Sequence, residues 1–342
     1  MSTEGGTKAV VAALLANLGI AITKFIAFFM TGFSSMLAEA IHSVADSGNQ
    51  VLLLFGGKRA RREATPQHPF GYGRERYVYA FIVSIVLFTV GGLFALYEAY
   101  HKWHETHDDP SFDPFESQWW WVPVLVLAVA IVLESFSFRT AIVESNKVRG
   151  KRSWGEFVRS AKAPELPVIL LEDLAALLGL IFAFFGVGLM LLTGNPIFDV
   201  IGTTLIGVLL VAVAIFLAVE MKSLLLGESA SPEHIARIVE AIESVDGIDR
   251  VIHQRTLHVG PEEVVVAAKV AVPTTSGAGD VADAINAAEA RARDVAPGLT
   301  LLMYLEPDLD TGAGERPAWQ HSEHILENAG DKPLPPTGGP DH

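Results

Sequence analysis

The stretch AEAIHSVADSGNQV, residues 38–51, places polar side chains inside an otherwise apolar segment. His42 and Asp46 stand four residues apart, so on a helix their side chains meet on one face. An imidazole beside a carboxylate is a donor set that suits a divalent metal ion. On a helical wheel the polar residues of this stretch fall within a sector of about 100°; they are Glu39, His42, Asp46, Asn49 and Gln50.

This polar stripe has a second interpretation, an interhelical hydrogen-bond ladder that holds no ion. A lone histidine would favour the ladder. A carboxylate at that depth, however, either protonates or pairs with a cation. The pairing of His42 with Asp46 therefore favours half of a metal site.

A second acidic pair, Glu172 and Asp173, lies in the apolar segment PELPVILLEDLAALLGLIFAFFG. Two ligands do not hold a metal ion, so another segment must contribute. Adjacent residues diverge by about 100° on a helix, and only one of the pair can point squarely at an ion. We expect Asp173 to bind directly. Glu172 is then a supporting group, a proton acceptor, or the partner of Lys24.

The segments that position these residues are long and apolar. Half of the 342 residues are hydrophobic, and a membrane-spanning helix needs about 20 mostly apolar residues. At 1.5 Å per residue, Asp46 and Asp173 would lie at comparable depth. We predict an integral membrane protein with six transmembrane helices, over residues 8–31, 34–57, 77–102, 119–143, 166–193 and 197–221.

The remaining polar residues of these segments are expected to be structural. Asp199 either caps the sixth span or lines an exit path. Three histidines of the acidic loop between the third and fourth spans either attract metal or belong to a solvated loop, and we favour the solvated loop; they are His101, His104 and His107. Interhelical hydrogen bonds or ion pairs are expected for Asn17, Glu98, Glu134 and Arg139.

The distribution of Lys and Arg predicts the orientation. Residues 58–76 and 147–162 are both basic, whereas the loop at 101–118 is acidic. Basic loops face the cytoplasm, which places both termini there. No Arg- and Ser-rich transit segment precedes the first span, so we expect a bacterial-type plasma membrane.

The chain changes character after the spans. We predict a transmembrane domain at 1–228, a cytosolic α+β domain at 229–308 and a disordered tail at 309–342. The middle segment has the order α-β-β-α-β, which is ferredoxin-like, with helices on one face of a sheet.

Composition excludes several function classes. The net charge is −14 and many of the basic residues are confined to membrane-proximal loops, so the sequence shows no footprint of nucleic-acid binding. The absence of cysteine excludes thiolate metal sites. An intramembrane metalloenzyme is disfavoured because no H-E-x-x-H spacing occurs.

Taken together, these residues resemble the cation diffusion facilitator family, the zinc-transporter-like exporters. The resemblance covers about residues 8–307 and includes H-x-x-x-D as His42 and Asp46. The segments LAEAIHSVADSGNQ, HPFGYGRERYVYA and VILLEDLAALLGL are most similar to the divergent branch that contains the mitochondrial-type zinc transporter.

The resemblance implies a four-ligand site between the second and fifth spans. His42, Asp46 and Asp173 match three positions, and Ile169 stands at the fourth. Asn49, Glu172 or water would then complete the shell, with Asn49 our first choice.

Two auxiliary sites of the family are altered in this chain. In the loop after the second span His68 is kept but its partner is Tyr72. In the cytosolic domain His253 is kept, while Lys269 and Tyr304 replace ligands. An ammonium group cannot ligate a metal, so we expect metal binding there to be weak or absent. His253 and His258 are expected on the surface of a strand.

The resulting hypothesis is a homodimer, in contact through both domains, that exports a divalent cation in exchange for protons. The cation is the transported ion and no cofactor is expected. Zinc is the first choice, and Mn²⁺, Fe²⁺ and Co²⁺ also suit an oxygen-rich site. The alternative is a membrane scaffold that binds metal in an incomplete site without transporting it.

Overall fold

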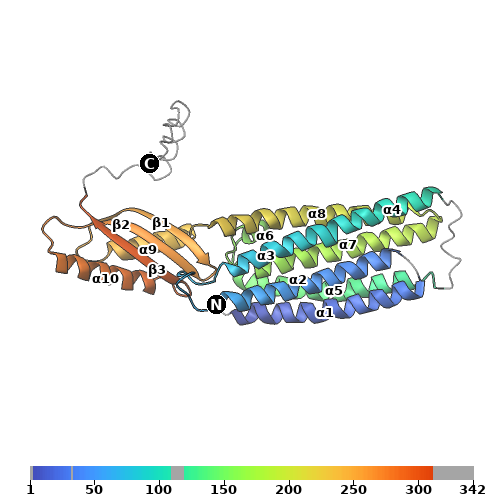
Figure 1. Ribbon diagram of the computed structural model, residues 1–342, viewed down its shortest axis with the longest axis horizontal. Coiled ribbons are helices and arrows are strands. Elements are labelled where there is room, and N and C mark those ends of the chain that lie inside the picture. The colour runs from blue at the N-terminus through green and yellow to red at the C-terminus, as the bar shows by residue number, and fades with distance from the viewer. Residues whose placement is uncertain (1–2, 32–33, 109–118, 311–342) are drawn as a thin grey trace, which may run out of the picture. The chain divides into compact units, whose positions relative to one another are not determined.

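The computed structural model describes residues 3–31, 34–108 and 119–310 (Figure 1). They divide into two compact units, one from Met1–Gly227 with Val259–Glu262 and one from Glu228–His258 with the residues from Glu263 onward. The expected tail lies outside the described residues beyond Asp310, as does most of the acidic loop.

The first unit is a bundle of long helices. A short helix, α6 (Trp154–Ser160), lies in the second basic loop, which sequence patterning had indicated only as a loop. The long helices are α1 (Thr3–Thr31), α2 (Ser34–Ala60), α3 (Glu75–Val86) continued by η1 (Leu87–Leu93) and α4 (Phe94–Asp108), α5 (Val122–Arg149), α7 (Glu165–Thr193) and α8 (Ile197–Leu226).

Four stretches of helix are long and apolar enough to cross a membrane within the described part of the chain. α1 contributes a shorter apolar stretch, Asn17–Met30. The polar stripe of α2 lowers its hydropathy, which is why this helix is not among the four. Six spans therefore stay a prediction, and the four stretches are Glu75–Glu105, Val122–Arg149, Glu165–Thr193 and Ile197–Leu226.

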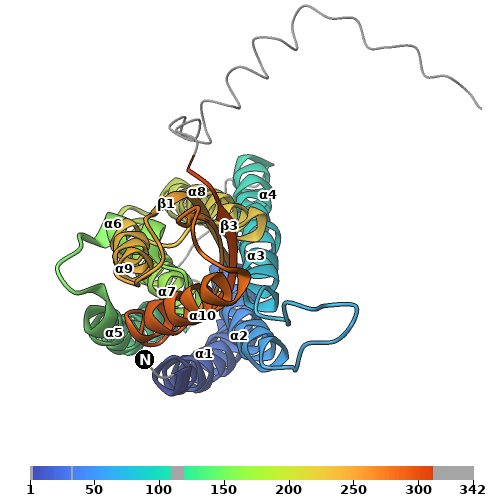
Figure 2. The same ribbon diagram turned by 90° about the vertical axis from the view of Figure 1, so that its left-hand side faces the viewer.

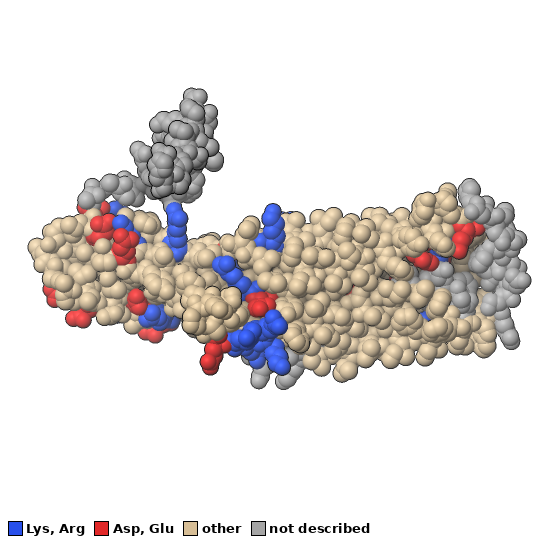
Figure 3. Space-filling view, viewed as in Figure 1, with Lys and Arg blue, Asp and Glu red and all other residues tan. Residues whose placement is uncertain are grey.

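The outward faces of the bundle are apolar. Phe29 is 80% exposed and Leu192 is 84% exposed, and Phe185 and Val219 also point outward. Figure 3 shows a broad band between the two ends of the bundle in which no charged side chain reaches this face. A large exposed apolar surface of this kind suits contact with lipid.

The third long helix is interrupted by a π-helical segment, η1, where the sequence predicts one continuous helix. Short π segments inside helices are frequent at functional sites. Gly92 lies in this segment, and a Cβ on it would approach Val211 Cγ2 of α8 to 2.7 Å. The widened turn is thus packed closely against α8. Hydropathy could not predict it, because the widening leaves the apolar character unchanged.

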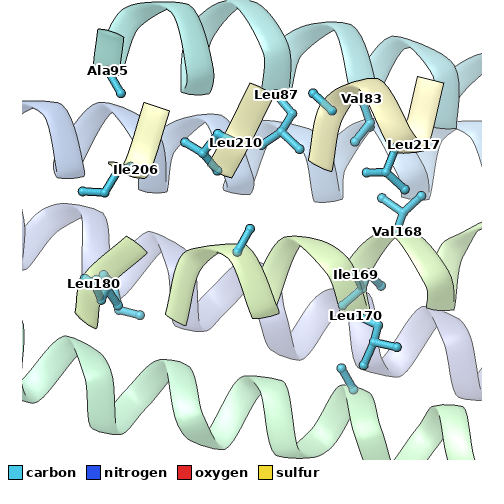
Figure 4. Close-up of a cluster of buried hydrophobic side chains, with 14 of the residues drawn as sticks. Val83, Leu87, Ala95, Val168, Ile169, Leu170, Leu180, Ile206, Leu210 and Leu217 are labelled. Carbon is cyan, nitrogen blue, oxygen red and sulfur yellow. The ribbon is translucent and has the colours of Figure 1, made fainter. Parts of the chain in front are cut away.

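The interior of the bundle is built by helix packing around α7 and α8. α1 packs against α2 and α5, while α7 packs against α5 and α8 (Figure 2). α7 and α8 approach most closely at Gly186 and Gly202, where a Cβ on either residue would lie 2.9 Å from a carbonyl oxygen of the other helix. Small residues allow such close approach between membrane helices. Figure 4 shows the adjoining core, which includes Val83, Leu87, Ile169, Leu210 and Leu217.

The second unit is a small α+β fold. Its sheet has the order β1-β2-β3, with β2 and β3 parallel in the register Glu263↔Thr300 to Ala271↔Asp308. Parallel neighbours need a crossover connection, and α10 supplies it. The elements are α9 (Pro232–Glu243), β1 (Arg250–Gly260), β2 (Glu263–Ala271), α10 (Ala278–Asp294) and β3 (Thr300–Asp308).

Alternation along β2 decides which face of the sheet the helices cover. Val264, Val266 and Val270 are fully buried and belong to one core with residues of α9 and α10. The intervening Ala267 is exposed. The sheet therefore has one covered face and one open face, as period-two patterning predicts.

Candidate metal centre

The polar stripe of α2 faces the interior of the bundle. His42, Asp46 and Asn49 are all buried, at 8%, 5% and 0% exposure. His42 Nε2 lies 3.5 Å from Asp46 Oδ2, the contact that their four-residue spacing predicts. One half of the expected site is thus formed within a single helix.

The α7 residues are both buried, and they point to different neighbours. Asn49 Nδ2 donates a hydrogen bond to Glu172 Oε1 at 2.7 Å, which joins α2 to α7. Ser137 Oγ of α5 donates to Asp173 Oδ2 at 2.8 Å. Because adjacent side chains diverge on a helix, Glu172 and Asp173 take different partners, as expected.

Several buried polar atoms of this region have no hydrogen-bond partner among the described residues. A buried polar atom left unpaired costs about 1–3 kcal/mol, so a group of them on facing helices is the signature of a site that takes a ligand. The atoms are His42 Nδ1, Asp46 Oδ1, Asn49 Oδ1, Glu134 Oε1 and Glu172 Oε2.

A small cavity of about 20 Å³ lies beside His42. Glu39, Gly91 and Thr203 also line it. This volume holds one water molecule, and a Cβ on Gly91 would lie 3.6 Å from His42 Nδ1. The imidazole therefore has room on its unpaired side.

Lys24 of α1 is the buried cation of this region. Its Nζ donates to Glu39 Oε2 at 2.8 Å and to Ser43 Oγ at 2.9 Å. The interpretation that paired Lys24 with Glu172 is therefore wrong. The cause is the close packing of α1 on α2, which brings the ammonium onto the stripe itself and leaves Glu172 to Asn49.

The ligand set stands as two separate halves. Within the described residues, no three His, Asp or Glu side chains lie close enough together to hold a metal ion. His42 and Asp46 form the half on α2, and Asp173 with Ser137 forms the half between α7 and α5. Ile169 is 2% exposed and packs into the apolar core (Figure 4), so its position supplies no ligand.

Three described histidines of the first unit that lie outside the stripe have local partners. His68 packs against the ring of Tyr72, with centroids 4.7 Å apart, so the aromatic partner replaces a ligand there. His101 is exposed and lies 3.4 Å from Glu105. His104 Nδ1 lies 3.2 Å from the carbonyl oxygen of Tyr100. The side chain of His107 lies outside the described residues.

Asp199 does not cap α8 and instead forms an ion pair with another helix. Lys102 Nζ of α4 donates to Asp199 Oδ2 at 2.6 Å, and both side chains are largely buried. The carboxylate therefore joins α4 to α8.

In the second unit, the residues that we matched to an auxiliary metal site lie together on the open face of the sheet. His253, Lys269 and Tyr304 line one hollow of about 440 Å³. Hydrogen bonds to Asp308 and Glu306 raise the pKa of the Lys269 ammonium, so it stays charged and disfavours a cation. His258 was expected on the strand surface, but it is buried at 3% exposure near the end of β1, where its backbone N–H donates to the backbone carbonyl oxygen of Glu228.

Sequence reasoning missed the contribution of α5. Ser137 was not considered, and Glu134 was expected to make a structural pair, whereas Ser137 binds Asp173 and Glu134 Oε1 has no partner within the described chain. The available signal was their spacing, since residues three apart share a helix face.

Comparison with known proteins gives one family. A model described as the cation efflux transmembrane domain matches residues 10–226. The mitochondrial proton-coupled zinc antiporter of Xenopus laevis is 35% identical over 256 residues, which are 74% of this chain and 44% of that protein. The human protein of the same name is 34% identical over 252 residues, 73% of this chain and 43% of that protein.

A plant protein is also similar. Metal tolerance protein C4 of Arabidopsis thaliana is 26% identical over 263 residues, which are 76% of this chain and 56% of that protein. The chain thus spans less than half the length of the two vertebrate relatives and a little over half of the plant relative.

Proposed function

Because this chain belongs to the cation efflux family, we propose that it exports a divalent metal cation in exchange for protons. A protein of this family is a transporter and not an enzyme, which agrees with the sequence analysis. The observation that carries the proposal is the group of unpaired polar atoms on α2 and α7, buried inside a bundle with an apolar surface.

The cation is bound between the two halves of the metal centre. His42 and Asp46 supply a nitrogen and a carboxylate oxygen from α2, and Asp173 supplies a carboxylate from α7. Asn49 can use Oδ1 as a further ligand while its Nδ2 holds Glu172. Glu172 is the supporting carboxylate that fixes the amide.

Zinc is our first choice of cation. It accepts imidazole nitrogen and carboxylate oxygen in a four-coordinate shell, and the vertebrate relatives are named zinc antiporters. The donor set is rich in oxygen, so Mn²⁺, then Fe²⁺ or Co²⁺, are the next candidates.

The exchange follows from the chemistry of the ligands. Cation and proton compete for the same atoms, because imidazole and carboxylate bind either one. Histidine has an ordinary pKa of about 6.5, so a modest pH difference changes its charge. The two halves close on a bound cation, and they open outward when His42 and a carboxylate gain protons. This cycle gives alternating access.

We place this centre in a bundle of six membrane spans. The basic loops and both termini face the cytoplasm, and the chain acts as a homodimer that makes contact through the bundle and the α+β unit. The membrane is proposed as a bacterial-type plasma membrane. The vertebrate relatives carry "mitochondrial" in their names, and cell fractionation distinguishes the two locations.

The test is flux in proteoliposomes, with a panel of metals and an imposed pH gradient. We expect transport of zinc by the unaltered chain and its loss in Asp46→Ala and in Asp173→Ala, because each removes a charged ligand from one half. Transport that survives both substitutions would refute the site.

A second candidate is a membrane scaffold that binds metal without transporting it. Two observations favour it: the position of Ile169 offers no ligand, and no three ligand side chains meet within the described residues. Metal binding in detergent without flux in the proteoliposomes would support this candidate instead.

A further inference from the structure

Glu134 is a carboxylate buried in the bundle with no assigned role. It lies on α5 and is 3% exposed. Its Oε1 has no hydrogen-bond partner in the described part of the chain. A carboxylate inside a membrane span is costly and by default marks a functional position.

Glu134 lies on the helix that forms one half of the metal centre with α7. α5 packs against α7, the helix that carries Asp173. Ser137 stands one turn further along the same helix and binds Asp173. Since residues three apart share a face, Glu134 lies on the side of α5 turned towards the centre.

The buried ammonium of Lys24 is engaged by other side chains, since it donates to Glu39 and Ser43. Glu134 and Asp173 are buried carboxylates on two helices that pack together, α5 and α7, and Asp46 is a third buried carboxylate, on α2. A divalent cation is the ligand that such an arrangement attracts.

We propose that Glu134 supplies a carboxylate oxygen to the transported cation, in place of the ligand that Ile169 does not provide. The proposal rests on the proposed function and adds a third helix, α5, to the site. The ligands then comprise one nitrogen and at least three carboxylate groups. Such a set binds hard ions such as Mn²⁺ relatively well, because Mn²⁺ prefers oxygen donors.

The substitution Glu134→Gln tests the proposal. It keeps the shape of the side chain and removes the charge. We expect the Kd of the purified full chain for Mn²⁺, measured by titration calorimetry in detergent, to rise by at least about tenfold. The Kd for Zn²⁺ should rise less, since His42 remains.

Glu134→His sharpens the test, because an imidazole replaces the lost ligand with one that zinc prefers. We expect this variant to regain zinc binding and not manganese binding. If Glu134 had only a structural role, replacing it with His would not change the preference of the site between zinc and manganese. The matched control is Glu144→Gln, on the same helix, where Glu144 pairs with the exposed Lys147; it should bind both metals as the unaltered chain does.

The outcomes separate this proposal from the proposed function. If Asp173→Ala abolishes metal binding while Glu134→Gln matches the unaltered chain for both metals, only the role of Glu134 is overturned. Equal weakening for both metals without rescue by Glu134→His also overturns it. If Asp173→Ala binds normally, the site itself is refuted. Each variant is first checked for unchanged helix content and elution volume.

Discussion

At the scale of single residues, a hydrogen bond between two buried side chains joins α2 to α7, the helices that carry His42 with Asp46 and Asp173. Asn49 donates to Glu172 across the α2–α7 interface, and neither side chain is accessible from outside. The Oδ1 atom of Asn49 has no hydrogen-bond partner among the described residues. Asn49 therefore combines a positioning contact with a possible ligand atom.

Replacing Asn49 with Ala should remove both contributions. We expect the zinc transport rate in proteoliposomes to fall by about tenfold, the size of effect seen when groups that orient metal ligands are lost. Gln50→Ala is the control, because Gln50 is equally buried on the next position of α2. An Asn49→Ala variant that transports as fast as the control would contradict this assignment.

The Lys24–Glu39 pair makes a prediction about stability. Both groups are buried, and removing one partner of a buried pair leaves an uncompensated charge, which costs about 3–5 kcal/mol. We therefore expect Lys24→Met to lower the free energy of unfolding in detergent strongly. The double variant Lys24→Met/Glu39→Leu should recover much of the loss. A single variant as stable as the unaltered chain would show that the pair does not exist.

How far the sequence predicts the centre differs from residue to residue. The contact of His42 with Asp46 is fixed by helix geometry, so spacing alone predicts it. Lys24 pairs with Glu39 and not with Glu172 because of how α1 is rotated against α2. The spacing of residues within one helix does not predict that rotation. The three-residue spacing of Glu134 and Ser137 indicates that they share a face of α5, but it does not indicate that this face meets α7.

At the scale of elements, the approach of α7 to α8 depends on Gly186 and Gly202. We expect Gly186→Ala to cost about 1–3 kcal/mol, because its Cβ would lie 2.9 Å from the carbonyl oxygen of Phe198. Gly188→Ala is the matched control, since a Cβ there meets nothing within 4 Å. Thermal unfolding of both variants measures the difference, and equal midpoints would exclude a tight crossing at Gly186.

The long helices were largely predictable from apolar segments, and their interruptions were not. A segment of about 20 apolar residues indicates a helix whatever its local winding. The π-helix η1 has the same composition as its flanks, so only packing against α8 reveals it. Helix α6 begins at a capping box, in which Ser153 Oγ accepts from Glu156 N. That signature is short and local, and it was available in the sequence.

At the scale of the whole molecule, the candidate ion centre belongs to the bundle. His253, Lys269 and Tyr304 lie together on the open face of the sheet. The Lys269 ammonium forms ion pairs with Asp308 at 2.9 Å and Glu306 at 3.3 Å, so it stays charged and disfavours a cation there. The parallel pairing of β2 with β3 follows from the crossover through α10. We therefore expect the proposed coupling of ion and proton movement to depend on the two halves of the bundle centre.

The most direct test of that coupling measures both ions at once. Proteoliposomes that contain the full chain and a trapped pH-sensitive dye are given a pulse of Zn²⁺ while zinc uptake is followed in parallel. The account predicts that zinc entry drives protons out, so the lumen becomes more alkaline, and that His42→Ala abolishes both movements. Zinc entry with no change in lumenal pH, or exchange that persists in His42→Ala, would contradict it.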